Sequence, residues 1–154
     1  VYITEYPACI LGSFERQYLS LPREVLVTVM RHHQKYFSVE NAQGELEPNF
    51  IAVMNTADDP EGWVRKGNER VLRARFNDAR FFWDMDQQKT LAQRIPLLAN
   101  VTFQARLGSY LDKTKRVAAL VRELGGDDHA LRAAELSKTD LTTEMVKEFT
   151  DLQG

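Results

Sequence analysis

The sequence lacks several features that would define a protein class at once. It has a single cysteine, Cys9, which excludes an internal disulfide and is typical of a reducing compartment. It has no run of about 18 apolar residues, so no transmembrane helix is predicted, and its first residues do not resemble a signal peptide. We therefore expect a cytoplasmic protein with no membrane partner.

Motifs for metal and phosphate binding are also missing. The chain has three histidines, and the adjacent pair His32 and His33 would point about 100° apart on a helix, too far to share one metal ion. There is no HExxH, no CxxC and no glycine-rich phosphate loop. The sequence therefore predicts no metal site, no catalytic residue and no cofactor within this chain.

The composition fits one ordinary domain or two small units. The 154 residues are 44% hydrophobic and 27% charged, with a formal net charge of -2. Many of the 20 Lys and Arg residues fall between Arg65 and Arg116, so a local basic face remains compatible with this net charge. Because the chain starts at Val1 rather than Met, we expect it to be a piece of a longer protein.

The first third of the chain reads as a mixture of strands and one helix. Val1–Leu11 is rich in β-forming residues and contains Pro7, which is typical of an edge strand. Ser20 is the predicted cap of a helix that has Pro22 in its first turn and ends near His32. This helix is expected to bury Val25, Leu26, Val29 and Met30. KYFSV and FIAVM, separated by a turn with Asn41 and Gly44, predict a hairpin.

Helical periodicity dominates after the polar loop 55–62. The predicted helices are 67–86, 91–98 with a kink at Pro96, 111–124 and 129–136. A last apolar helix face is predicted at Met145, Val146 and Phe149. The 111–124 helix is expected to bury Val117, Leu120, Val121 and Leu124, to end at Gly125–Gly126, and to be followed by a cap at Asp127 or Asp128. The predicted fold class is α+β, a mixed strand and helix part followed by an all-helical part.

The 67–86 helix is the most charged and aromatic stretch of the sequence. At the helical period, Leu72, Phe76, Ala79 and Trp83 share one apolar stripe. Arg75 falls inside this apolar arc, and Asp78 follows three residues later, which predicts a partly buried ion pair that fixes the helix against its neighbours.

Basic residues around this helix are candidates for a phosphate-binding face. The candidates are Arg65, Lys66, Arg70, Arg73, Arg80, Lys113 and Arg116, with Trp63 and Phe81 among them. Nucleic-acid binders use Lys and Arg for the backbone and exposed aromatics for unpaired bases. The same pattern also fits an ordinary solvated helix face. Gln34 and Lys35 form a second possible polar site, or simply the C-terminus of a helix.

Six ordered blocks carry a resemblance to a known family, the β subunit of the bacterial two-subunit glycyl-tRNA synthetase. The blocks are EYPACILGSFERQYLSLPREVL, HQKYFSV, GELEPNFIAVMN, GNERVLRARFNDARFFWDMD, FQARLGSYLDKTKRV and LSKTDLTTEMVKEFTDLQG. HQKYF and GNERVLRARFNDARFF are the most specific of these motifs.

The resemblance implies a tRNA ligase that attaches glycine to its tRNA with ATP and Mg²⁺. The implied partners are the tRNA and an α subunit that carries the aminoacylation site. Residues 1–56 resemble the end of a B3/B4-like module, 57–104 would be connecting helices, and 105–154 resemble the first helices of an HD-type domain.

Three interpretations remain open. In the first, the segment binds tRNA and acts as a scaffold without catalysing. In the second, it is a metal-dependent phosphohydrolase of the HD type or an editing hydrolase. The resemblance speaks against this, because the counterpart of the His–Asp dyad is Lys138-Thr139-Asp140, which has no histidine. In the third, the segment only braces contacts between subunits.

Overall fold

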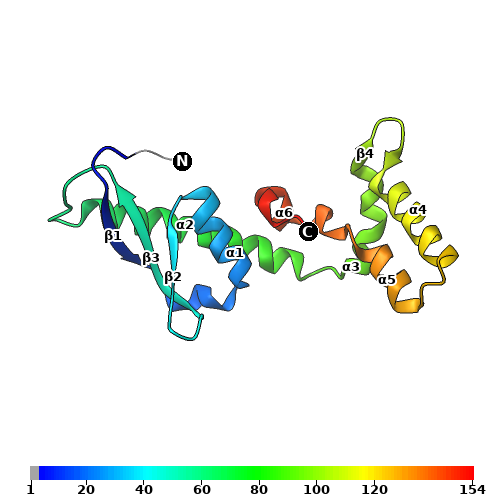
Figure 1. Cartoon of the computed structure of the whole chain (residues 1–154), viewed down its shortest axis with the longest axis horizontal. Coiled ribbons are helices and arrows are strands. Elements are labelled where there is room, and N and C mark those ends of the chain that lie inside the picture. The colour runs from blue at the N-terminus through cyan, green and yellow to red at the C-terminus, as the bar shows by residue number, and fades with distance from the viewer. Residues whose placement is uncertain (1–3) are drawn as a thin grey trace. The chain divides into compact units, whose positions relative to one another are not determined.

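The structure of the protein is a computed structural model that describes residues 4–154. Val1–Ile3, the start of the predicted N-terminal strand, lie outside the described residues. The chain forms two compact units, Val1–Phe82 and Trp83–Gly154, and helix α2 (Trp63–Asp86) contributes residues to both (Figure 1). A small antiparallel sheet with helices in the first unit and mainly helices in the second confirm the predicted α+β class.

The first unit is built on a three-stranded antiparallel sheet. Its elements are β1 (Ala8–Ser13), a 3₁₀ turn (Arg16–Ser20), α1 (Arg23–Thr28), a π-helical turn (Val29–His33), β2 (Phe37–Glu40), β3 (Leu46–Met54) and the first part of α2. The strand order is β1-β3-β2, as Figure 1 shows, so β1 lies at an edge as predicted, although it starts at Ala8 and ends at Ser13, two residues beyond the predicted end. It begins directly after Pro7, because proline cannot donate to the β-ladder. The predicted hairpin is confirmed as β2 and β3.

Aromatic side chains fill the core of the first unit. Phe76 of α2 meets the ring of Phe14 edge-on at 4.9 Å between centroids and that of Tyr18 at 5.3 Å, and Tyr36 stacks on Phe50 at 4.6 Å. All five are buried. The two tyrosine hydroxyls do not remain unpaired, since each donates to an asparagine of α2, namely Asn77 at 2.7 Å and Asn68 at 3.0 Å. Burial raises the pKa of Tyr36.

The predicted helix near Ser20 differs from expectation at both ends. Ser20 does not cap it, because the Ser20 hydroxyl donates to the Gln17 carbonyl and closes the preceding 3₁₀ turn instead. Pro22 occupies the N-cap position. The C-terminal part widens into the π-helical turn Val29–His33. The four predicted core residues, Val25, Leu26, Val29 and Met30, are buried.

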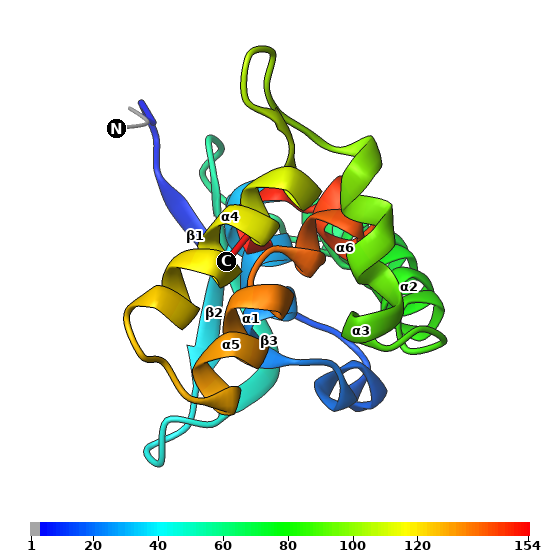
Figure 2. The same ribbon diagram turned by 90° about the vertical axis from the view of Figure 1, so that its right-hand side faces the viewer.

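The second unit is mainly helical but contains a short hairpin that the sequence analysis did not predict. Its elements are the end of α2, α3 (Leu91–Arg94), a 3₁₀ turn (Ile95–Asn100), β4 (Thr102–Gln104), β5 (Gly108–Ser109), α4 (Tyr110–Glu123), α5 (Asp128–Leu136), a 3₁₀ turn (Thr139–Thr142), α6 (Glu144–Glu148) and a last 3₁₀ turn (Thr150–Leu152). Pro96 changes the helix type from α3 to the 3₁₀ turn. Helices α4 and α5 lie side by side in both views (Figures 1 and 2).

Local caps define the helix ends of the second unit. Thr90 with Gln93 and Ser109 with Asp112 form capping boxes at the starts of α3 and α4. Gly125 has φ +76°, and the N–H of Gly126 donates to the Val121 carbonyl at 2.9 Å, so α4 ends in a Schellman motif at the predicted glycine pair. The α5 cap is Asp127, as predicted.

A buried ion pair lies at the centre of the second unit. The Arg94 guanidinium donates to the Asp86 carboxylate at 2.8 Å, and their side chains are 5% and 10% exposed. Arg94 also donates to the Thr142 carbonyl, while Asp86 accepts the backbone N–H of Met145 at 2.8 Å and that of Glu144 at 3.0 Å. Every charge in the pair is therefore compensated by several partners, as buried ions require.

The inward face predicted for α4 is wrong in part. Leu120 and Leu124 are exposed, and Val117 and Val121 are only half-buried, whereas Thr114 and Ala118 are buried. α4 therefore packs through the stripe of smaller side chains formed by Thr114 and Ala118, which lets the helix lie close to its neighbours. Within residues 4–154, no helix is both long and apolar enough to cross a bilayer.

Candidate functional site

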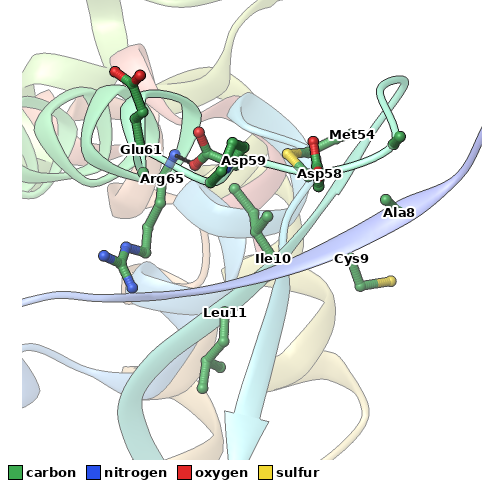
Figure 3. A pocket seen from close by; sticks show the side chains of 12 residues that line it. Ala8, Cys9, Ile10, Leu11, Met54, Asp58, Asp59, Glu61 and Arg65 are labelled. Carbon is green, nitrogen blue, oxygen red and sulfur yellow. Dashed lines mark hydrogen bonds between the residues drawn. The ribbon is translucent and has the colours of Figure 1, made fainter.

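The start of α2 is fixed by an acidic cap. The Asp59 carboxylate accepts the backbone N–H groups of Val64 at 3.1 Å and Arg65 at 2.9 Å. The hydrogen bond from Arg65, followed by those from Val64 and Trp63, holds the pKa of Asp59 below its ordinary value despite an opposing desolvation. Figure 3 shows Asp59 beside the Arg65 backbone nitrogen. The α2 helix therefore has a well-defined start, which fixes the side chains of its first turns.

A hollow of about 570 Å³ lies between this loop and strand β1. Figure 3 shows Asp58, Asp59, Glu61 and Arg65 along its rim, with Ile10 between them and the strand. Asp59 is engaged as the α2 cap and Glu61 binds Trp63, so these carboxylates already have partners within the protein.

Trp63 is exposed and yet held in place. Its side chain is 69% exposed, its indole Nε1 donates to the Glu61 carboxylate, and the Lys66 ammonium lies 5.2 Å from the centroid of its ring. An aromatic ring that is both accessible and oriented can stack on a nucleotide base with little loss of conformational entropy.

An exposed line of side chains runs along α2 from Trp63 to Phe81. Eighteen residues are five full turns of an α-helix, so these two aromatics lie on the same line about 27 Å apart. Phe81 is 59% exposed. Lys66 and Arg70 lie near this line, whereas Arg65 lies on nearly the opposite side of the helix, beside the hollow. We call Trp63, Lys66, Arg70 and Phe81 the α2 line. None of the cations Arg65, Lys66 and Arg70 forms an ion pair with a carboxylate within the described part of the chain.

Two predicted phosphate ligands of the same helix are engaged elsewhere. Arg73 forms an ion pair with Glu15 at 2.5 Å. Arg80 donates to the Gln17 carbonyl, lies 3.3 Å from the Ser20 hydroxyl and packs over the Tyr18 ring at 5.1 Å from its centroid. Both guanidinium groups therefore connect α2 to the segment that follows β1.

The predicted ion pair of Arg75 and Asp78 is present, but Asp78 is exposed and only Arg75 is half-buried. Its closest atoms are 3.9 Å apart, and the two side chains are 43% and 54% exposed. An exposed pair of this kind contributes little to stability. A buried ion pair is formed instead by Arg94 and Asp86. Periodicity could not reveal it, because the groups that it binds come from four separate segments.

Lys113 and Arg116 lie in the second unit. The Lys113 ammonium is 4.4 Å from the Phe103 ring centroid, and Arg116 donates to the Leu107 carbonyl at 3.1 Å. Both side chains therefore support the β4–β5 hairpin.

Gln34 and Lys35 lie where the π-helical turn leads into β2. Lys35 has φ +59°, and its ammonium donates to the His32 carbonyl at 2.7 Å. Lys35, but not Gln34, lines a second hollow of about 560 Å³.

The segment Lys138-Thr139-Asp140 forms part of a 3₁₀ turn and its start. Thr139 is fully buried, and its hydroxyl donates to the Leu136 carbonyl at 2.8 Å. Across residues 4–154, no three His, Cys, Asp or Glu side chains cluster closely enough to hold a metal ion.

Comparison with known proteins gives one consistent family. A family model described as "Glycyl-tRNA synthetase beta subunit" matches residues 1–154. Glycine--tRNA ligase beta subunits from Acidobacterium capsulatum, Syntrophotalea carbinolica and Bacillus subtilis are 56%, 47% and 44% identical to this chain. Each match covers 99% of the chain and 23%, 23% and 24% of the relative, so the chain spans about a quarter of the length of these relatives.

These matches first define a class, the subunits of aminoacyl-tRNA synthetases. Within this class, the chain belongs to the glycyl-tRNA synthetase beta subunit family. The resemblance inferred from the six sequence blocks is thereby confirmed.

Proposed function

We propose that this chain is the part of a glycine–tRNA ligase beta subunit that binds tRNA phosphates through the α2 line and acts as a scaffold without catalysing. The observation that carries the proposal is the exposed row of Lys66 and Arg70 between Trp63 and Phe81, and Arg65 adds a further exposed cation in the first turn of the same helix. Cations without a carboxylate partner attract phosphates, and the two aromatics provide surfaces for unpaired bases.

The names of the relatives support the same proposal at the level of the whole protein. That protein would join glycine to its tRNA with ATP and Mg²⁺, together with an α subunit, in the cytoplasm. The boundaries 1–56, 57–104 and 105–154, and the likeness of the last part to an HD-type domain, remain part of this proposal.

The cations differ in the role that we assign to them. Arg73 and Arg80 are proposed to hold α2 in place, since both are engaged with the segment after β1. Lys113 and Arg116 are proposed as secondary phosphate contacts in the second unit, because both side chains support the β4–β5 hairpin.

A salt titration tests the proposal. Labelled glycine tRNA is titrated with the protein by fluorescence anisotropy at several salt concentrations, for the wild type and the triple variant Arg65→Gln/Lys66→Gln/Arg70→Gln. Each lost phosphate contact reduces the magnitude of the slope of log K against log salt concentration by about 1. The slope of the triple variant is therefore expected to be smaller by about 2–3.

The matched control is Lys89→Gln/Arg106→Gln, which removes two exposed cations outside the α2 line. This control should bind tRNA like the wild type. An unchanged slope in the triple variant would contradict the proposal, and the segment would then be a brace rather than an RNA-binding surface.

A further inference from the structure

Lys35 has an unusual backbone conformation. Among residues 4–154, five have a positive φ, and four of them are glycines, namely Gly44, Gly62, Gly108 and Gly125. Lys35, with φ +59°, is the fifth. Glycine adopts this region without penalty, whereas a residue with a Cβ is strained there. The chain thus carries a long cationic side chain where glycine would fit better, and such an outlier is a reason to look for a function.

The surrounding backbone holds Lys35 firmly. The N–H of Tyr36 donates to the Met30 carbonyl at 2.8 Å, which closes the π-helical turn, and β2 begins at Phe37. One donor of the Lys35 ammonium is used by the His32 carbonyl at 2.7 Å. Because an ammonium has three donors, two remain for a ligand.

The side chain of Lys35 lines an open hollow of about 560 Å³. The lining residues are Val27, Arg31, His32, Lys35, Tyr36, Phe37 and Ser38. None of them is acidic, Arg31 and Lys35 are cationic, and Phe37 is an apolar ring that is 62% exposed. The hollow therefore combines positive charge, a hydroxyl group and an accessible aromatic surface.

We propose that this hollow binds a nucleotide, with Arg31 and Lys35 on its phosphate and Phe37 against its base. Guanidinium and ammonium groups form charge-assisted hydrogen bonds with phosphate oxygens, and every base has a face that can stack on an aromatic ring. A free nucleotide and the end of an RNA strand share this chemistry. The site lies outside the α2 line and does not depend on the function proposed for it.

A competing explanation assigns Lys35 to the helix alone. A lysine near a helix C-terminus stabilises the last carbonyls and the helix dipole, and the bond to His32 fits this role. In that case replacing Lys35 would lower stability and leave nucleotide binding unchanged.

The experiment measures binding of adenosine 5′-monophosphate by calorimetry and of a short labelled single-stranded oligoribonucleotide by anisotropy. The variants are Lys35→Asn, which tolerates the left-handed conformation, Lys35→Gly and Arg31→Gln, with Lys89→Gln as the matched control. We expect the three site variants to weaken binding at least about tenfold, the control to bind normally, and Lys35→Gly to raise the melting temperature.

The two probes distinguish the sources of the nucleotide. Binding of the monophosphate identifies a free nucleotide, and binding of the oligoribonucleotide alone identifies an RNA strand. No binding of either probe by the wild type would overturn the proposal. Binding by Lys35→Asn that equals wild-type binding would also overturn the proposal. Oligoribonucleotide binding that is lost in Arg70→Gln but kept in Lys35→Asn would overturn it as well, because the RNA would then bind at the α2 line.

Discussion

The two compact units are stabilised by different means. The first has a core of aromatic rings from strands, turns and α2, and its buried hydroxyls bind asparagines of that helix. In the second, local caps define the helix ends, and a buried ion pair binds backbone groups from distant segments. Both units also use helix caps and apolar burial, so the comparison teaches that the largest buried group differs, packed aromatic rings in one region and a compensated ion pair in the other. Mutations should therefore affect the two units differently.

The largest effect is expected for the aromatic core of the first unit. Phe76→Ala removes a fully buried ring that contacts Phe14 and Tyr18, and it should cost about 4 kcal/mol of unfolding free energy. Urea denaturation measures the loss, and amide hydrogen exchange localises it. Faster exchange confined to the second unit would contradict this assignment.

The buried ion pair should matter nearly as much in the second unit. Arg94→Met keeps the bulk of the side chain but leaves the Asp86 carboxylate buried without its cation, at a cost of about 3 kcal/mol. Hydrogen exchange should accelerate around α3 and α6 while the sheet stays protected. A variant as stable as the wild type would show that the backbone N–H groups of Glu144 and Met145 compensate Asp86 alone.

Two glycines of the first unit should respond in opposite directions. A Cβ on Gly12 would lie 2.3 Å from the Phe50 ring, so Gly12→Ala should destabilise by about 1–3 kcal/mol through overpacking. Gly67 lies within α2 with no atom within 4 Å of such a Cβ, and Gly67→Ala should stabilise by about 0.8–1 kcal/mol. Thermal unfolding checks both, and the same sign for the two changes would contradict the packing described for β1.

Acidification should loosen one helix start in each unit. The Asp59 and Asp112 pKa values lie below their ordinary value of 3.8, the first chiefly through the Arg65 N–H and the second through the Ser109 N–H. The ionised caps therefore stabilise the fold fully above about pH 4, and this contribution is lost as the pH falls through the lowered values. Amide hydrogen exchange at the starts of α2 and α4 measures this loss of stability on acidification. The pH dependence should disappear at α2 in Asp59→Ala and at α4 in Asp112→Ala.

The smallest effect is expected for the exposed pair on α2. A double-mutant cycle of Arg75→Ala and Asp78→Ala should give a coupling energy of about 0–0.5 kcal/mol. A coupling above about 2 kcal/mol would be that of a desolvated pair and would restore the structural role predicted from the sequence.

The sequence predicted the helices and strands better than it predicted which groups pair with the charged side chains. Periodicity located α2 from residue 67 onward and missed its first four residues, and it identified the buried stripe because Leu72, Phe76 and Ala79 recur at the helical spacing. It could not separate Arg70 from Arg73, since the angle on a helix does not reveal that Glu15 lies beside one of them. Asp86 was missed for the same reason, because the N–H groups it accepts come from residues 58 and 59 positions later.

The other predictions that the structure corrects also have physical reasons. An apolar stripe on α4 predicted burial of Leu120 and Leu124, but the helix packs through the smaller side chains of Thr114 and Ala118. The candidate site was predicted as a set of cations and aromatics, whereas the orientation of Trp63 by Glu61 and Lys66 required coordinates.

The central claim is that the cations of α2 divide into RNA ligands and structural ties. The most direct test measures tRNA affinity and melting temperature together for Arg65→Gln/Lys66→Gln/Arg70→Gln and for Arg73→Gln/Arg80→Gln. We predict that the first variant loses affinity at an unchanged melting temperature and that the second melts at a lower temperature. Full tRNA affinity in the first variant, or loss of affinity without loss of stability in the second, would contradict the division.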